Sequence, residues 1–157
     1  MTRGLALVPI DRDGVARGDV GAASGPLVDA LQATVELYER SGFEEPWVSY
    51  VALVGQAAVG ICGFTAPPRD GRVEIAYYTF PGGEGRGYAT AMAAELLAIA
   101  HRRRPDVTVT AQTVPARNAS HRVLEKLGFA HVAMAEDAEA GTVWEWSAAA
   151  GDGGRGD

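Results

Sequence analysis

Hydrophobic residues recur along the chain with two different spacings. Alternation with a period of two indicates strands with one buried face, and a spacing of three and four residues indicates amphipathic helices. The predicted strands cover residues 5–10, 47–54, 57–64, 72–80, 107–113, 129–135 and 142–147. The predicted helices begin at Pro26, at about Tyr88 and at Asn118. This order of strands and helices predicts a mixed α/β (α+β) fold.

Two segments show no hydrophobic period. Residues 11–25 are polar and glycine-rich, which predicts a long mobile connection, either a substrate lid or a disordered insertion. Residues 149–157 offer nothing that can be buried, and we expect a disordered tail there. No repeat interrupts the remainder, so residues 1–148 are predicted to form a single domain.

Composition and charge argue against several classes of protein. A net charge of −6, from 14 basic and 20 acidic residues, disfavours a nucleic-acid-binding surface. No apolar run approaches ~18 residues, so no membrane span is expected. The lack of a signal peptide and the single cysteine, Cys62, favour a reducing, cytoplasmic location. The histidines lack the spacing of metal ligands, and no metal site is predicted.

A glycine-rich turn joins the predicted strand 72–80 to the helix that begins at about Tyr88. Glycines at 82, 83, 85 and 87 leave backbone N–H groups accessible, and the helix dipole adds about half a positive charge at the first turn. The turn therefore predicts a phosphate site. No lysine follows these glycines, which argues against a Walker loop, and the fingerprint of a dinucleotide fold is incomplete.

Two motifs resemble those of the GNAT acyltransferase family. The turn is similar to the family's coenzyme A pyrophosphate loop, Arg/Gln-x-x-Gly-x-Gly/Ala, with Gly87 and Ala89 at the last two fixed positions and Glu84 at the first. Residues 113–129, TVPARNASHRVLEKLGF, resemble the second coenzyme A motif, in particular that of the ribosomal-protein N-terminal acetyltransferases (RimJ/RimL-like). The resemblance covers about residues 47–147.

The resemblance implies a GNAT fold, in which a mixed, mostly antiparallel sheet of about seven strands is flanked by helices and contains a splayed strand pair at the cofactor. Acetyl-CoA is the implied cofactor. Its pantetheine is expected to pair with the backbone of Tyr78, Thr79 and Phe80. Its pyrophosphate is expected to lie on Gly85, Arg86, Gly87, Tyr88, Ala89 and Thr90. Glu84 places a carboxylate near the diphosphate, and we expect it to weaken cofactor binding.

Three residues of the second motif are further cofactor candidates. The resemblance implies that Asn118 bonds the pantetheine amides, and the same residue type also serves as a helix N-cap, so that both roles are compatible. Ser120, in the first helical turn, has the same two options. Arg122 is expected either to reach a phosphate or to be a surface arginine.

Acetyl transfer to an amine requires a base, donors for the developing oxyanion and a thiolate that can leave. The resemblance implies that Glu74 is the base, acting through a water; its alternative interpretation is an exposed strand residue. Backbone amides near the end of the same strand are the expected oxyanion donors. Leu124 stands where many family members have a tyrosine that acts as the general acid. This leaves Ser120, Tyr77 and Tyr78 as candidate proton donors.

The resemblance predicts an acetyl-CoA-dependent N-acetyltransferase that acts by direct attack in a ternary complex. The acceptor is expected to be a primary amine, either a protein N-terminus or a small molecule. A different interpretation is a non-catalytic acyl-CoA-binding or sensor module, which Glu84, Gly82-Gly83 and Leu124 favour. A longer acyl donor and a homodimer both stay open as alternatives.

Overall fold

The computed structural model describes residues 4–22, 24–113, 119–137 and 141–148. The strands are β1 (Leu5–Pro9), β2 (Ser49–Val54), β3 (Ala57–Phe64), β4 (Arg72–Thr79), β5 (Thr108–Thr113), β6 (Ala130–Asp137) and β7 (Gly141–Ala148). The helices are α1 (Gly25–Ser41), α2 (Tyr88–Arg103) and α3 (Ala119–Lys126). The predicted order of strands and helices is confirmed, and the ends differ from the expected ones by at most two residues.

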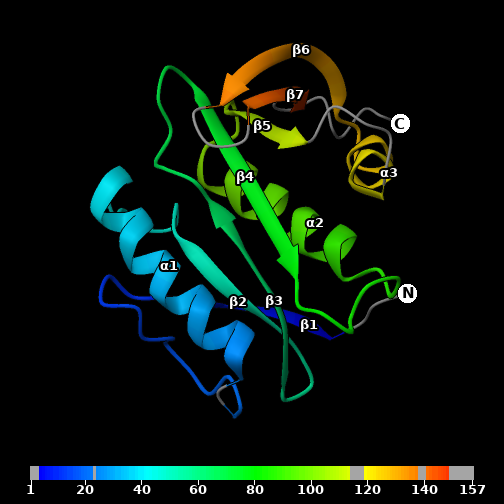
Figure 1. Ribbon diagram of the computed structural model, residues 1–157. Helices are drawn as coiled ribbons and strands as arrows, with labels where there is room; N and C mark the ends of the chain where they lie inside the picture. The colour runs from blue at the N-terminus through cyan, green and yellow to red at the C-terminus, as the bar shows by residue number, and fades with distance from the viewer. Residues whose placement is uncertain (1–3, 23, 114–118, 138–140, 149–157) are drawn as a thin grey trace.

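The strands of the described segments form one sheet in the order β1-β2-β3-β4-β5-β7-β6 (Figure 1). Strands β4 and β5 run parallel, and the other neighbouring strands are antiparallel. The parallel strands β4 and β5 are connected through the helix α2, as a crossover between parallel strands requires. The expected mixed, mostly antiparallel sheet is therefore confirmed.

The parallel strands β4 and β5 separate soon after they meet. They pair only from Arg72 opposite Thr108 to Glu74 opposite Thr110. Beyond that point β4 continues along β3, whereas β5 continues along β7. The sheet is thus split between β4 and β5, as Figure 1 shows, and the expected splayed strand pair is confirmed.

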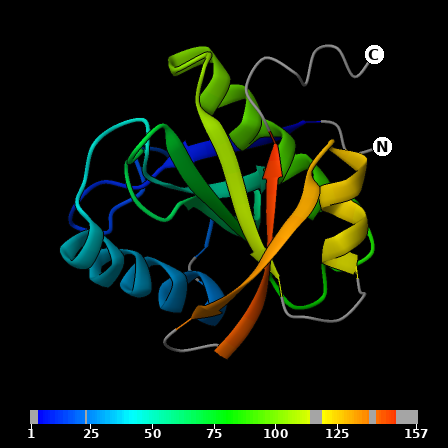
Figure 2. The same cartoon turned by 90° about the horizontal axis from the view of Figure 1, so that it is seen from above.

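Helices α1 and α2 cover opposite faces of the sheet (Figure 2). Val73 and Ile75 of β4 are buried in the same cluster as Met92 of α2. Phe80, just beyond β4, is buried in a second cluster with Leu27 of α1. Since successive side chains of a strand point to opposite faces, the hydrophobic alternation of β4 places its odd-numbered residues toward α2 and its even-numbered ones toward α1.

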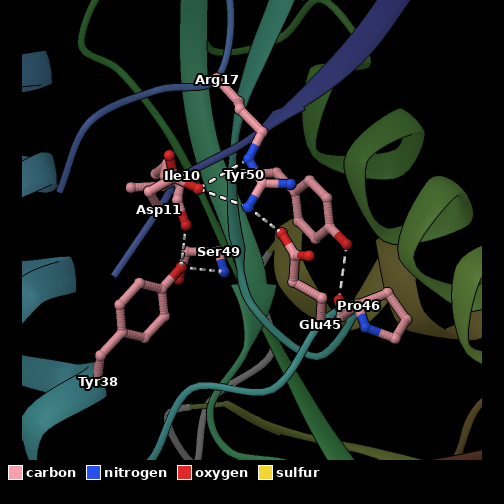
Figure 3. A network of polar contacts seen from close by, with 8 residues as sticks. All are labelled: Ile10, Asp11, Arg17, Tyr38, Glu45, Pro46, Ser49 and Tyr50. Carbon is pink, nitrogen blue, oxygen red and sulfur yellow. Dashed lines mark hydrogen bonds and ion pairs between the residues drawn. The ribbon is translucent and has the colours of Figure 1, made fainter. Parts of the chain in front are cut away.

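Tyr38 fixes the C-terminal half of α1 to the sheet (Figure 3). Its buried hydroxyl donates a hydrogen bond to the Ile10 carbonyl (2.8 Å) and accepts one from the Ser49 N–H (2.9 Å). A buried backbone group left without a partner costs about 1–3 kcal/mol. Both bonds therefore oppose any displacement of α1, and they preserve the space between this helix and the sheet.

The connection between β1 and α1 is held more firmly than its composition suggests. Ile10 and Ala16 form an isolated antiparallel bridge within it. The Arg17 guanidinium contacts Asp11 Oδ1 at 2.6 Å and Glu45 Oε2 at 2.5 Å, so that it ties the connection to the segment before β2 (Figure 3). The first part of this connection forms a defined turn, and its mobility stays a prediction.

Candidate functional site

The split in the sheet exposes one edge of β4. Hydrogen bonds from Thr65 N–H to the Glu74 carbonyl (3.0 Å) and from Phe80 N–H to the Val59 carbonyl (2.9 Å) mark the two ends of its pairing with β3. The register between these ends is unbroken. Because backbone groups of successive residues point in alternate directions, the even-numbered residues 74–80 bond toward β3. Residues 77 and 79, which lie beyond the last pair with β5, therefore direct their backbone groups to the open side.

Because of this alternation, the three residues predicted to pair with pantetheine do not all direct their backbone groups to the open edge. Thr79 has its backbone groups on the open edge, and so does Tyr77, which the sequence did not nominate for this role. The Phe80 N–H is already bonded to the Val59 carbonyl, and the Phe80 ring belongs to the core. Tyr78 bonds toward β3, and the residue is 55% exposed.

Glu74 lies at the point where the two strands part. It faces Thr110 of β5 in the last pair of the parallel register. Its side chain is half-buried and lines a cavity of about 650 Å³, to which Arg40 of α1 and Thr110 also contribute. A half-buried carboxylate that lines a cavity can be reached by a substrate, as a candidate general base must be.

Tyr77 and Ser120 meet across the split. A side-chain hydrogen bond joins Tyr77 of β4 to Ser120, which lies in the first turn of α3. Burial raises the pKa of Tyr77 above its usual value, and the bond from Ser120 opposes this shift. The Tyr77 hydroxyl therefore stays protonated at neutral pH. The contact brings together two of the candidate proton donors.

The glycine-rich turn leads into α2 as expected. Gly85 and Gly87 have φ values of 81° and 84°, in the left-handed region that side chains rarely adopt. Gly87 is the N-cap of α2 and provides no side-chain cap, so the first N–H groups of this helix point out of the turn. Residues 85–90 are exposed or half-buried, as a candidate anion-binding turn requires.

The carboxylate of Glu84 is turned back on its own loop. Its Oε1 accepts a hydrogen bond from the Gly82 N–H (2.9 Å). Gly82 itself has a φ of 94°, so this bond stabilises a turn that precedes the amides of residues 85–90. Glu84 thus has a structural role that sequence reasoning missed, in addition to its expected repulsion of a diphosphate.

The second motif is only partly described by the structure. Asn118 lies outside the described residues. Helix α3 carries Ser120, which is half-buried, and Arg122, which is exposed. Leu124 is completely buried in the main hydrophobic cluster, so the position of the usual acidic tyrosine belongs to the core here.

A second cavity, of about 710 Å³, lies between α1 and the strands β3 and β4. Small residues of α1, Ala30 and Ala33, line one side, and Ala76 lines the other. Cys62 also borders it, and burial raises the pKa of its thiol far above the usual range. Sequence reasoning missed this cavity, although the small residues on one face of α1 were a usable signal.

The described residues show neither a metal-binding cluster nor a membrane-spanning helix. These residues contain no group of three or more side chains of histidine, cysteine, aspartate or glutamate arranged to hold a metal ion. None of the described helices is long and apolar enough to cross a membrane.

Comparisons with known proteins address the family. A family model described as an acetyltransferase (GNAT) domain matches residues 16–130. No curated protein sequence matches the chain significantly.

Several solved structures share the fold. RimL, a ribosomal L7/L12 alpha-N-protein acetyltransferase, is 18% identical with a TM-score of 0.69, and 94% of each chain is covered. The ribosomal-protein-S5-alanine acetyltransferase from Vibrio fischeri is 14% identical with a TM-score of 0.68, covering 97% of this chain and 96% of the other. A structure of RimL in complex with coenzyme A is 15% identical, with a TM-score of 0.65 and coverage of 94% and 95%.

Proposed function

The chain belongs to the GNAT family of acetyltransferases, which use acetyl-CoA as acyl donor, and we propose that it transfers the acetyl group to a primary amine by direct attack in a ternary complex. The observation that carries this proposal is the position of Glu74, which borders a cavity where β4 parts from β5. The thioester supplies the activated acyl group, and the chain supplies a binding edge, an anion site and a base.

The backbone groups along the split match the polar groups of coenzyme A. The backbone groups of Tyr77 and Thr79 face the open edge and bind an amide-containing chain in the manner of an added strand. The amides of residues 85–90 bind the pyrophosphate at the N-terminus of α2. We propose that Asn118 and Arg122 assist this binding, as their motif implies.

Glu74 removes the proton that blocks attack. A lysine-like amine has a pKa of about 10.4 and a terminal α-amine one of about 8, so that much of either amine is protonated at neutral pH. Glu74 accepts this proton through a water. The backbone amides at the open edge then stabilise the charge that develops on the acyl oxygen.

The second motif and the fold favour the RimJ/RimL-like branch for this chain. Both named relatives in that branch act on ribosomal proteins, and the likeness is carried by the fold rather than by sequence identity. We therefore propose a protein N-terminus as the first class of acceptor to test, and a small-molecule amine as the second.

The test measures release of the coenzyme A thiol from acetyl-CoA with a panel of peptide N-termini and small amines. With the best acceptor, we expect Glu74→Gln to lower kcat by about 100-fold, a typical contribution of a general base. The calorimetric Kd for acetyl-CoA should change less than about threefold, because Glu74 lies outside the anion-binding turn. Glu39→Gln, an exposed carboxylate on α1, is the matched control.

Two results would contradict the proposal. Unchanged turnover in Glu74→Gln would show that Glu74 is not the general base. If acetyl-CoA binds tightly but no amine of the panel causes thiol release, the proposal that the acceptor is a primary amine is contradicted.

A further inference from the structure

Two arginines face each other across a tight turn before β4. Arg69 and Arg72 exchange both backbone hydrogen bonds, at 2.9 and 3.0 Å. The two residues between them, Asp70 and Gly71, have φ values of 54° and 76°, as in a type I′ turn. The turn fixes the directions in which the flanking arginines leave the backbone.

This arrangement places like charges side by side. Directly opposite residues in such a pair have Cβ atoms about 5 Å apart, and like charges in that position destabilise the pair. Within the described part of the chain, neither Arg69 nor Arg72 forms an ion pair that would relieve the repulsion. An anion bound between the two guanidinium groups would relieve it.

A third arginine converges on the same place. Arg40, in the last turn of α1, lines the 650 Å³ cavity together with Arg69 and Arg72. The same cavity is bordered by the carboxylates of Asp70 and Glu74, so cations are in excess there. The chain as a whole carries 14 basic and 20 acidic residues, and this arginine cavity therefore has the opposite charge balance from the rest of the molecule.

The arginines lie within reach of the proposed base. Arg72 and Glu74 are separated by one residue on β4, so they share a face, and their Cα atoms are about 7 Å apart. An acceptor whose amine is at Glu74 would therefore bring groups one residue away against Arg72. A guanidinium group binds a carboxylate through two parallel hydrogen bonds.

We propose that the arginine cavity binds a carboxylate of the acceptor, and that the substrate is an amine with an acidic group within about one residue of its nitrogen. This inference rests on the proposed role of Glu74 as the base. It disfavours polyamines, because a second ammonium group would lie against the guanidinium groups. The carboxylate can belong to an acidic polypeptide N-terminus or to a free acidic amino acid.

The test is a calorimetric titration of the whole protein, in the presence of coenzyme A, with acetylated products. The ligands are an acetylated tetrapeptide with glutamate at position two, its glutamine counterpart, N-acetylglutamate and acetylspermidine. We expect the glutamate peptide to bind about tenfold more tightly than the glutamine peptide. The difference should shrink to less than about twofold in Arg72→Gln and at about 0.5 M salt, which screens exposed charges.

Arg69→Gln provides a second variant in case Arg72→Gln disturbs β4, and Arg102→Gln, exposed near the end of α2, is the matched control. Stronger binding of the peptide than of N-acetylglutamate would assign the acceptor to polypeptides, and the reverse to free amino acids. Equal binding of the glutamate and glutamine peptides, a preference that survives in both variants, or tighter binding of acetylspermidine would overturn the proposal. Since binding is measured without turnover, failure of Glu74 as the base would be seen separately.

Discussion

At the scale of single residues, the contact between Tyr77 and Ser120 bears on how the thiolate leaves. The usual tyrosine position holds the buried Leu124, so that place cannot supply a proton. Tyr77 is protonated at neutral pH because burial raises its pKa, and it lies on the strand whose edge faces the split. We therefore propose Tyr77 rather than Ser120 as the proton donor, with Ser120 as its positioning partner.

We expect Tyr77→Phe to lower kcat by about tenfold. This is less than the full effect of a general acid, since a thiolate with a pKa near 8.5 leaves with little assistance. The Kd for acetyl-CoA should change less than about threefold, because the backbone at position 77 is retained. Steady-state kinetics and calorimetry measure the two effects. A larger loss of kcat in Tyr78→Phe would instead assign the donor to Tyr78.

Part of this candidate site could be predicted from the residue types in the sequence. The remainder depends on contacts between residues that are far apart in the sequence. The Glu74 position followed from a motif, and the structure places it at a cavity. The pairing of Tyr77 with Ser120 joins residues far apart in the sequence, so no local pattern could reveal it. The converging arginines were missed for the same reason, although the Asp70-Gly71 pair is a recognisable signal for the turn that aligns two of them.

At the scale of elements, the glycine-rich turn combines two opposing effects of Glu84. Its carboxylate organises the loop through the bond to the Gly82 N–H, which should favour binding of an anion. Its charge opposes a diphosphate on the nearby amides. A substitution that keeps the hydrogen bond and removes the charge separates the two effects.

We expect Glu84→Gln to bind acetyl-CoA about threefold to tenfold more tightly, because the amide oxygen still accepts the bond from Gly82 while the repulsion disappears. Glu84→Ala should gain less, since it loses both effects. Isothermal titration calorimetry measures both, and the gain in Glu84→Gln should diminish in high salt. An unchanged or weaker affinity in Glu84→Gln would show that the charge does not act on the cofactor.

The elements themselves were largely predictable. Alternation in β4 and the helical period of α1 and α2 reflect burial on one face, which is a local property of the sequence. The direction of the β4 backbone groups depends on its register with β3, which the sequence does not encode locally. For this reason the motif named Phe80 for pantetheine, whereas the register commits its N–H to Val59.

At the scale of the whole molecule, several ionisable side chains are packed within the sheet and its helices. Burial is the main cause that raises the pKa values of Tyr38, Tyr50, Tyr77 and Cys62. The pKa of Tyr50 rises to about 12. In each case the folded chain holds its proton to a higher pH than the unfolded chain does. The stability that this contributes is complete below the unfolded pKa and is lost as the pH rises toward the folded value.

The free energy of unfolding should therefore decrease steeply between about pH 9 and pH 12. For Tyr50 alone, one pH unit above the usual tyrosine pKa of about 10 corresponds to about 1.4 kcal/mol.

Tyr50→Phe should cost about 1 kcal/mol at pH 8, because the bond from its hydroxyl to the Pro46 carbonyl (2.6 Å) is lost. Between pH 8 and pH 11, however, this variant should lose about 1.4 kcal/mol less than the wild type. Urea denaturation at a series of pH values measures both quantities, and Tyr78→Phe, at a residue that is 55% exposed, is the control. Parallel pH profiles for Tyr50→Phe and the wild type would mean that the Tyr50 hydroxyl ionises as readily in the folded chain as in the unfolded one.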